Sequence, residues 1–273
     1  MLDNLEDFGF VLAAFSALFG GLTILRRFAP YNPEILRKVL HGGMGLVALS
    51  LPWLFASAWP VIVLAGSLIA ALLAIRLVPP LRKGLGGIIY DVGRSSWGEI
   101  YFALGVACLF ALSGDDPLFY SVPVLVLALA DATASLVGGR YGRLRFEAWG
   151  GHKSVEGSVA FLAAAFCITA LGLLAVAALG STDSLIVALA LALPLSLVEA
   201  VAGQGSDNFF VPLAAFVLLK SLLAVGQTEV TVFLAITVVA VPRAFLFLYD
   251  RTQSKSAARR GLGADAPGLR NCA

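Results

Sequence analysis

The sequence predicts an all-α, polytopic membrane protein with about nine transmembrane helices. The chain has 273 residues, of which 59% are hydrophobic and 13% are charged. Soluble domains are on average about 25% charged, so this chain has too little charge to cover a soluble globule of its length. This composition excludes an ordinary soluble enzyme and a disordered chain. The length of the apolar stretches and the distribution of Lys and Arg support the same fold class.

Nine apolar stretches have the length that a membrane-spanning helix needs, because a bilayer core takes about 20 apolar residues per helix. Helices are expected because lipid offers no hydrogen-bond partners to the backbone, and the sequence lacks the alternating pattern of a membrane barrel. The predicted spans are roughly residues 8–25, 39–57, 59–78, 99–114, 117–138, 157–180, 184–201, 208–226 and 230–249.

The distribution of charge predicts the orientation of these helices. All but two of the nineteen Lys and Arg residues fall in the loops after the first, third and fifth spans or after the ninth; Lys220 and Arg243 lie inside spans. The loops on the opposite side carry only acidic charges. Because cytoplasmic loops are rich in Lys and Arg, the N-terminus is predicted outside and the C-terminus in the cytoplasm. Residues 1–250 are predicted to form one transmembrane domain, and residues 251–273 a disordered basic tail.

The overall charge and the cysteines point to no further partner. The net charge is only +2, which gives no reason to expect a nucleic-acid partner, and the three cysteines do not form a pattern typical of disulfides or of a metal site. The sequence does not predict an oligomeric state.

Carboxylates gather near the predicted cytoplasmic ends of the helices. Asp131 lies within the fifth span, while Glu99, Glu156, Glu199 and Asp207 lie at helix ends. An ionisable residue at membrane depth costs about 2.5–3.5 kcal/mol, so such positions indicate function. We therefore expect one shared site at this side. For Glu99 a structural role stays open, since acids at helix N-termini also complement the helix dipole.

The densest polar segment, residues 131–158, combines small residues, arginines and a glycine-rich loop. Backbone amides near Gly150 and Gly151 could face a phosphate, with Lys153 as a point charge. The segment is not a Walker A loop, because His152 separates Gly151 from Lys153. A basic loop is also what the positive-inside rule supplies without any function.

Two further clusters extend the predicted site. Arg37, Lys38 and His41 share one face of a helix at the start of the second span, although Arg and Lys there are also typical interfacial anchors. In the segment 199–212, glycines predict a tight turn before Asp207 and Asn208. Ser206 is expected to cap the next helix, which would leave Asp207 and Asn208 free to bind Mg²⁺.

These residue types together indicate phosphate chemistry. Carboxylates hold Mg²⁺, which bridges phosphate oxygens, and cations neutralise charge on a transferred phosphoryl group. Zinc is not expected, because the chain has two histidines and no paired cysteines. A site where water meets lipid suggests one water-soluble nucleotide substrate and one lipid substrate.

Four motifs in this order resemble those of the polyprenol kinase family, which contains phytol kinases and dolichol kinases. They lie within residues 34–215: Arg37-Lys38-x-x-His41-x-x-x-Gly45; Arg94-Ser-Ser-Trp-Gly-Glu99, which is most similar to phytol kinases; Asp131 to Gly142 with Lys153 to Ser158; and Glu199 followed by Asp207-Asn208-x-x-Val211-Pro212. The resemblance implies a membrane kinase that uses CTP and a divalent metal to phosphorylate a long isoprenoid alcohol.

The resemblance also suggests a role for each candidate residue. The predicted catalytic residues are Asp131, Lys153 and His41. The predicted metal ligands are Asp131, Asp207, Asn208 and Glu199. The predicted nucleotide-binding residues are Gly138, Arg140, Gly142, Gly150, Gly151, Ser154, Glu156, Arg37 and Lys38.

Two other functions stay open at this stage. A phosphatidate cytidylyltransferase also uses CTP on a lipid, but its motif lies near the C-terminus and ends in Asp-Arg-x-Asp, which does not follow His41-Gly42-Gly43 here. A transporter would place its charges near the midplane and often shows an internal repeat. The alcohol itself, phytol, geranylgeraniol, farnesol or dolichol, is not predicted.

Overall fold

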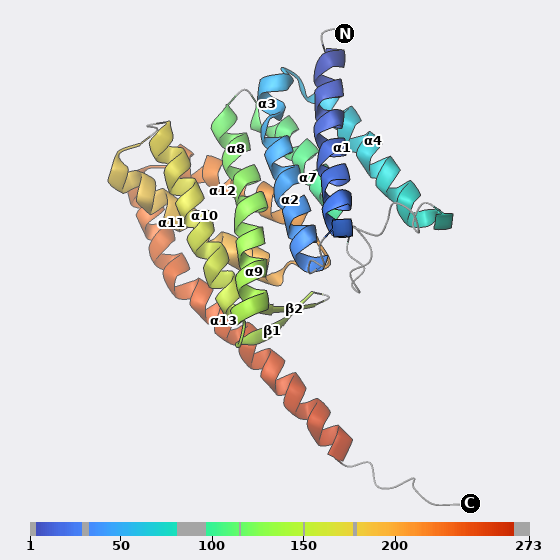
Figure 1. Cartoon of the computed structure of the whole chain (residues 1–273). Helices are drawn as coiled ribbons and strands as arrows, with labels where there is room; N and C mark the ends of the chain where they lie inside the picture. The colour runs from blue at the N-terminus through green and yellow to red at the C-terminus, as the bar shows by residue number, and fades with distance from the viewer. Residues whose placement is uncertain are drawn as a thin grey trace, which may run out of the picture.

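The computed structural model describes residues 4–28, 33–80, 97–114, 116–149, 151–176 and 179–264. Its helices form a bundle with a small β-hairpin at one end (Figure 1). The elements are α1 (Asn4–Phe28), α2 (Pro33–Leu49), α3 (Leu51–Leu54), α4 (Ala58–Leu77), α7 (Gly98–Ser113), α8 (Pro117–Leu125), the π-helical turn η1 (Val126–Ala130), α9 (Asp131–Tyr141), β1 (Arg145–Ala148), β2 (Gly151–Ser154), α10 (Val155–Ala175), α11 (Ser181–Val201), α12 (Asp207–Ala224) and α13 (Gln227–Ala264).

The predicted all-α membrane fold is confirmed. Within the described residues, seven helical segments are long and apolar enough to cross a membrane: Glu6–Leu25, Ala58–Leu77, Pro117–Tyr141, Val155–Ala175, Ser181–Val201, Asp207–Ala224 and Gln227–Lys255. The predicted second and fourth spans correspond to α2 and α7, which have 17 and 16 residues. Both are shorter than the about 20 residues that a perpendicular span takes. The count of nine spans and the orientation of the termini stay predictions.

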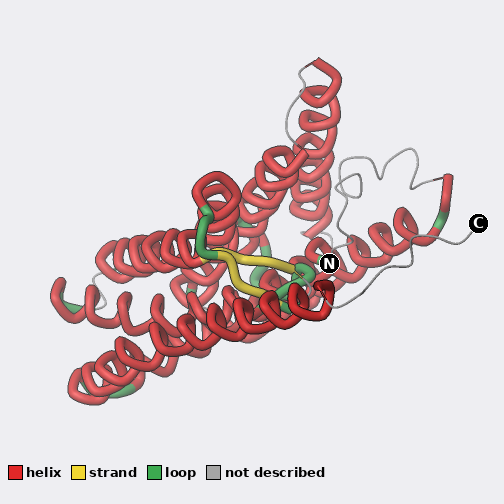
Figure 2. Tube along the Cα trace, turned by 90° about the horizontal axis from the view of Figure 1, so that it is seen from below, coloured by secondary structure: helices red, strands yellow, loops and turns green. Residues whose placement is uncertain are grey.

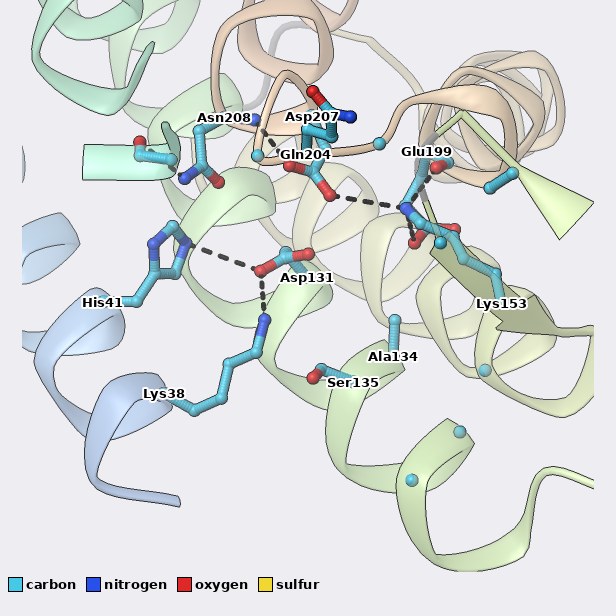
Figure 3. Close-up of a pocket in the computed structure, with 18 of the residues that line it drawn as sticks. Lys38, His41, Asp131, Ala134, Ser135, Lys153, Glu199, Gln204, Asp207 and Asn208 are labelled. Atoms are coloured by element: carbon cyan, nitrogen blue, oxygen red, sulfur yellow. Dashed lines mark hydrogen bonds and ion pairs between the residues drawn. The ribbon is translucent and has the colours of Figure 1, made fainter. Parts of the chain in front are cut away.

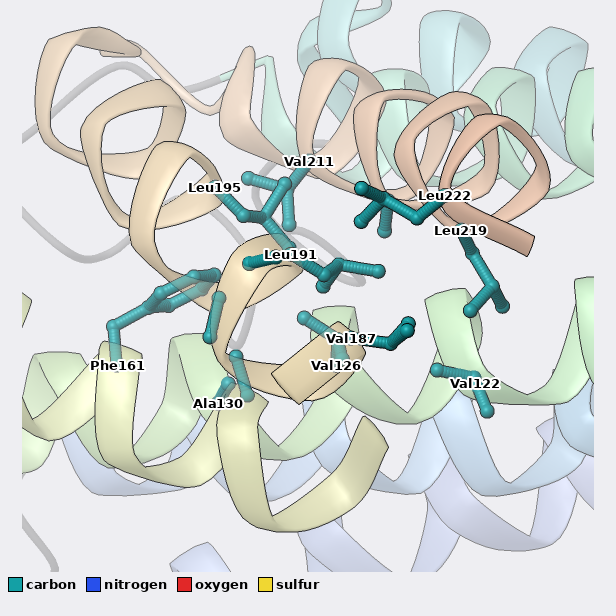
Figure 4. Close-up of a cluster of buried hydrophobic side chains, with 14 of the residues drawn as sticks. Val122, Val126, Ala130, Phe161, Val187, Leu191, Leu195, Val211, Leu219 and Leu222 are labelled. Atoms are coloured by element: carbon teal, nitrogen blue, oxygen red, sulfur yellow. The ribbon is translucent and has the colours of Figure 1, made fainter. Parts of the chain in front are cut away.

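The fifth predicted span lies at the centre of the bundle. It is a continuous helix made of α8, η1 and α9. One of its faces packs on α10, α11 and α12 through a cluster that includes Val126, Phe161, Leu191 and Leu195 (Figure 4). Another face contributes residues such as Leu127 to a second cluster with α1, α2 and α7. Neighbouring helices therefore pack on two sides of the segment that directly precedes Asp131.

The turn η1 directly precedes Asp131. Pro123 lies one turn earlier, and proline lacks the N–H that an α-helix needs. In a π-turn the backbone bonds run from i to i+5, so one extra residue is accommodated and the following side chains turn to a different face. This local geometry sets the direction in which Asp131 projects.

Residues that the sequence predicts as a glycine-rich loop form a hairpin. Strands β1 and β2 pair antiparallel, with Arg145 opposite Ser154 and Ala148 opposite Gly151. Seen along the bundle, the hairpin lies across the helix ends (Figure 2). Phe146 is fully buried, and its ring meets that of Phe245 on α13 edge to face, with the ring centres 5.9 Å apart.

Helix α13 continues past the hairpin and braces it. The Thr252 hydroxyl oxygen accepts a hydrogen bond from the backbone N–H of Glu147 at 2.8 Å, and Lys255 Nζ lies 2.7 Å from Glu147 Oε2. The helix ends at Ala264. Residues 251–264, the first part of the predicted tail, are thus described as helix, with Thr252 and Lys255 in contact with the hairpin. The division into a domain of residues 1–250 and a basic tail stays a prediction. Residues 265–273 lie outside the described part.

Candidate active site

A cavity of about 560 Å³ opens at the hairpin end of the bundle. Its volume falls in the range of about 300–1,000 Å³ that is common for ligand sites. Residues of α2, α7, α9, the hairpin, the end of α11 and the start of α12 line it (Figure 3). Elements that are far apart in the sequence thus meet around one space.

The first charged cluster in the cavity consists of Lys38, His41 and Asp131. Lys38 Nζ lies 2.8 Å from Asp131 Oδ2, and His41 Nε2 lies 3.7 Å from the same oxygen. The three side chains are only 9–10% exposed. Lys38 and His41 lie three residues apart on α2, which brings both to the helix face that meets α9.

The imidazole of His41 is held by two further contacts. Nε2 lies 3.2 Å from the backbone oxygen of Leu127, a residue of the π-turn. A carbonyl oxygen only accepts, so Nε2 donates in this contact. The edge of the ring also meets Phe102 of α7, with the ring centres 5.5 Å apart. The π-turn therefore positions both Asp131 and the histidine beside it.

The second charged cluster consists of Lys153, Glu199 and Asp207. Lys153 Nζ lies 2.6 Å from Glu199 Oε1 and 3.3 Å from Asp207 Oδ2, and it also donates to the backbone oxygen of Glu199. The hydroxyl of Ser158 donates to Glu199 Oε2 at 3.4 Å. Burial alone would lower the pKa of the Lys153 ammonium, but the two carboxylates outweigh burial and raise this pKa above its ordinary value. Lys153 is therefore protonated at neutral pH.

A tight turn between α11 and α12 positions Asp207. Gln204 and Gly205 have φ values of 56° and 88°, which confirms the predicted turn. Gly203 packs against the backbone oxygen of Trp149 in the hairpin so closely that a Cβ would overlap it. Ser206 does not cap α12 with its side chain as predicted, because its hydroxyl donates to the Gly203 oxygen at 2.8 Å and stabilises the turn instead.

Comparison with known proteins agrees with this arrangement. The chain is 32% identical to a phytol kinase of Synechocystis sp. over 194 residues, which cover 70% of this chain and 81% of that relative. The chain belongs to the polyprenol kinase family. No family model matches the chain, and no solved structure matches it.

The four motifs that resemble this family all contribute to the cavity. Each motif provides a residue of the cavity wall, namely Lys38, Glu99, Asp131 and Asp207 in the order of the motifs. Ten of the predicted site residues lie on its wall: Lys38, His41, Asp131, Gly138, Gly151, Lys153, Ser154, Glu199, Asp207 and Asn208.

Three predicted nucleotide-binding residues do not line this cavity. Arg140 is exposed, with its guanidinium 5.6 Å from the ring of Tyr141. Gly142 packs on Ser154, and Glu156 Oε1 accepts hydrogen bonds from the backbone N–H groups of Arg143 and Leu144 at 2.9 and 3.1 Å. Glu156 thus holds the start of the hairpin. The Arg37 side chain and Gly150 lie outside the described residues.

Sequence reasoning did not identify Gly98, Gln204 or Ser158 as parts of the site. Asn208 Nδ2 donates to the Gly98 oxygen at 2.8 Å, which ties the start of α12 to the start of α7 and leaves Asn208 Oδ1 as an acceptor. These contacts join positions as far as 110 residues apart. No local pattern in the sequence indicates them.

The donor set fits Mg²⁺ that is bound together with a nucleotide. Among the described residues, no group of three or more His, Cys, Asp or Glu side chains is close enough to hold a metal alone. Mg²⁺ in phosphoryl-transfer sites binds one or two carboxylates and completes its shell with phosphate oxygens and water. Asp207, with Glu199 beside it, offers such carboxylates, and the Asn208 oxygen adds an acceptor nearby. Asp131 belongs to the same cavity.

Proposed function

We propose that the protein transfers the γ-phosphate of CTP to the hydroxyl of a long-chain isoprenoid alcohol, with a phytol-type alcohol favoured over dolichol or geranylgeraniol. The products are the polyprenyl monophosphate and CDP. The observation that carries this proposal is the convergence of both charged clusters on one cavity, in a chain that is similar to a phytol kinase.

The two lysines give the cavity its means of binding a triphosphate. Lys38 and Lys153 enter from opposite elements, α2 and β2, and both are mostly buried. Buried cations attract phosphate more strongly than exposed ones, since water screens them less. Gly151 adds a wall position without a side chain, where phosphate oxygens can approach the backbone. Gly138, also on the wall, lets α9 pack closely against Ser154 and Gly157.

Asp131 is proposed to orient the alcohol and to accept its proton. The hydroxyl oxygen attacks the γ-phosphorus in line, the bond from that phosphorus to the β-γ bridging oxygen breaks, and the hydroxyl proton passes to the Asp131 carboxylate. Lys38 and His41 hold this carboxylate at 2.8 and 3.7 Å, which fixes its direction. Fixing a reacting group in this way lowers the entropy cost of the step.

A divalent cation, proposed as Mg²⁺, is expected to be held by Asp207, Glu199 and Asn208, with Asp131 as a further candidate. Bound there, it would neutralise charge on the phosphate oxygens during transfer. Lys153 lies 2.6 Å from Glu199 Oε1 and 3.3 Å from Asp207 Oδ2, so its charge would balance part of the charge of these carboxylates beside a bound metal.

The active site is proposed to face the cytoplasm. The cavity lies at the end of the bundle where α9 leads into the hairpin, and the described basic residues of that predicted loop, Arg140, Arg143, Arg145 and Lys153, lie at this end. Asp116, Asp183 and Glu229 begin α8, α11 and α13 at the opposite end (Figure 1). This separation agrees with the positive-inside rule.

A labelling experiment tests the proposed function. Membranes that contain the protein are mixed with γ-labelled CTP, ATP or UTP and with phytol, geranylgeraniol, farnesol or a dolichol, and label in the organic phase is measured. We expect most label with CTP and phytol, and at least about 10²-fold less in membranes with the D131N variant. Absence of lipid-bound label with every donor and alcohol would refute the kinase, and incorporation of label from α-labelled CTP into phosphatidate would favour a cytidylyltransferase instead.

A further inference from the structure

A second cavity, of about 520 Å³, is an apolar groove behind the polar cavity. It runs between the end of α11 and the first half of α12, and the side chain of Trp149 from the hairpin covers one end. The residues that line it are apolar except Ser206, whose hydroxyl already donates to Gly203. Several wall residues face outward, with Trp149, Phe210 and Val217 being 74%, 49% and 57% exposed. Phe210 and Val217 lie on α12, which is long and apolar enough to span a membrane, so this part of the groove faces outward at membrane depth.

The groove and the polar cavity share one thin wall. Along the chain, residues alternate between them: Val198 lines the groove and Glu199 the cavity, and Ser206 lines the groove and Asp207 the cavity. The hairpin does the same, since Trp149 borders the groove while Ala148 and Gly151 border the cavity. Gly203, which lines the cavity, packs directly against the backbone of Trp149, which lines the groove. The groove therefore lies beside the segments that carry Asp207 and Lys153.

The chemistry of the two spaces selects an amphiphile with an uncharged apolar chain and one small polar end. The groove offers no charge and no free polar group among its described lining residues, so it does not suit a headgroup. The polar cavity beside it carries Lys38, Lys153 and four carboxylates, those of Glu99, Asp131, Glu199 and Asp207. A single molecule that uses both must carry its polar group at the end of the chain.

We propose that this groove binds the hydrocarbon chain of the isoprenoid alcohol and aligns its hydroxyl with the cavity. The inference rests on the proposed function, because the alcohol is the substrate assigned there. Trp149 forms the inner end of the groove and Val217 the outer end. From Ser206 to Val217, α12 rises about 16 Å, so the groove contacts the part of the chain near the hydroxyl. The rest of a longer hydrocarbon chain continues into lipid. The groove therefore discriminates between alcohols by the isoprene units nearest the hydroxyl, and not by the total length of the hydrocarbon chain.

A matched pair of variants tests this site. V217W fills the groove, whereas V159W adds the same bulk on α10 at a lipid-facing position that is equally exposed, 58% against 57%. We expect V217W to raise the KM for phytol about tenfold, and V159W to leave it unchanged. With a short water-soluble prenol, which does not reach Val217, both variants should match the unaltered protein. Folding is checked by the thermal midpoint in detergent.

A binding measurement that does not depend on activity separates the two proposals. Phytol with a photoreactive diazirine on its chain is crosslinked to the full-length protein, and labelled peptides are identified by mass spectrometry. Label within residues 198–217, reduced in V217W but not in V159W, supports the groove. If the unaltered protein phosphorylates no alcohol but is labelled there, the proposed function fails and the groove stands as a prenol site. If it phosphorylates phytol while label lies elsewhere and both variants behave alike, the groove assignment is overturned.

Discussion

The two charged clusters of the cavity contain the same kinds of residues but differ in the number of carboxylates beside the lysine. In each, a lysine from one element pairs with a carboxylate from an element far away in the sequence, by 93 residues for Lys38 and Asp131 and by 46 for Lys153 and Glu199. The Lys38 cluster has one carboxylate, whereas Lys153 lies between two, Glu199 and Asp207. Lys153 and Asp207 are also more exposed, at 19% and 15%, than Lys38 and Asp131, at 10% and 9%.

This difference suggests a division of labour. The second carboxylate and the greater access to Lys153 and Asp207 suit a metal ion that arrives with a nucleotide from water, while Glu199 itself is only 6% exposed. The Lys38 cluster, with one carboxylate for one lysine, suits a carboxylate whose direction must be fixed. The D131N, K153M and D207N variants below each break one cluster and leave the other intact, and E156Q leaves both intact.

The largest effect is expected for D131N. The amide keeps the shape of the side chain but accepts no proton and carries no charge, so turnover should fall by about 10²- to 10⁴-fold. Turnover is measured by the labelling assay on protein purified in detergent. The control is D183N, the same substitution in the first turn of α11 at the opposite end of the bundle, which should retain full activity. Turnover of D131N within a few-fold of the unaltered enzyme would remove Asp131 from the reaction.

The next largest effect is expected for K153M, which removes the cation and leaves two buried carboxylates facing each other. We expect about a 10²-fold loss of turnover and a lower thermal midpoint. The control K255M removes a lysine that also contacts a carboxylate but is 48% exposed on the outside of the hairpin. It should change activity by no more than a few-fold, because exposed ion pairs contribute little. Equal losses in both variants would indicate that the hairpin acts through stability alone.

The raised pKa of Lys153 predicts the pH dependence of its contribution to stability. A group whose pKa is raised by folding stabilises fully below its unfolded value, about 10.4 for lysine, and loses this contribution only as pH rises through the folded value. The difference in thermal midpoint between K153M and the unaltered protein should therefore stay constant from about pH 7 to about pH 9.5. A difference that disappears within this range would show that Lys153 loses its proton there.

A smaller and more selective effect is expected for D207N. If Asp207 binds the metal, the Mg²⁺ concentration for half-maximal rate should rise by about 10-fold or more, while the KM for the alcohol stays nearly constant. A magnesium titration of D207N beside the unaltered enzyme measures this. The same titration of K38M is the comparison: that variant should lose turnover without a shift in the Mg²⁺ requirement. Identical shifts in both variants would contradict separate roles for the two clusters.

The smallest effect on turnover is expected for E156Q. In the structure, Glu156 accepts hydrogen bonds from the backbone N–H groups of Arg143 and Leu144 and does not line the cavity, so we expect it to position the hairpin and not to contact the nucleotide. Because the glutamine oxygen can still accept these bonds, turnover should stay within a few-fold and the thermal midpoint should fall slightly. A large loss of turnover at an unchanged thermal midpoint would restore Glu156 to the nucleotide site.

The sequence predicted most of the scaffold, since each helix carries its own signal. An apolar stretch of about 20 residues specifies a span without reference to any neighbour. The motifs also located most of the cavity wall, because carboxylates and lysines at membrane depth are costly and stand out. The glycines at 203 and 205 predicted a turn that the positive φ values at Gln204 and Gly205 confirm.

The remaining features depend on contacts between distant segments. The π-turn before Asp131 consists of ordinary apolar residues, Val126 to Ala130, whose sequence is typical of a regular α-helix. The hairpin was missed because its order comes from packing: Phe146 buries its ring against Phe245, and Glu147 meets Thr252 and Lys255. Arg140 was expected on the phosphates, yet its position on α9 turns it to solvent. A side chain's direction at a helix end is set by tertiary packing, which residue type alone does not specify.

The most direct test of the shared cavity is an experimental structure with Mg²⁺ and a CTP analogue that cannot transfer its γ-phosphate. The account predicts the triphosphate between the two clusters, with its γ-phosphate near Asp131 and the metal bound by Asp207. A triphosphate bound on the outer face of the hairpin, beside Arg140 and Arg143 and away from Lys38 and Asp131, would contradict it.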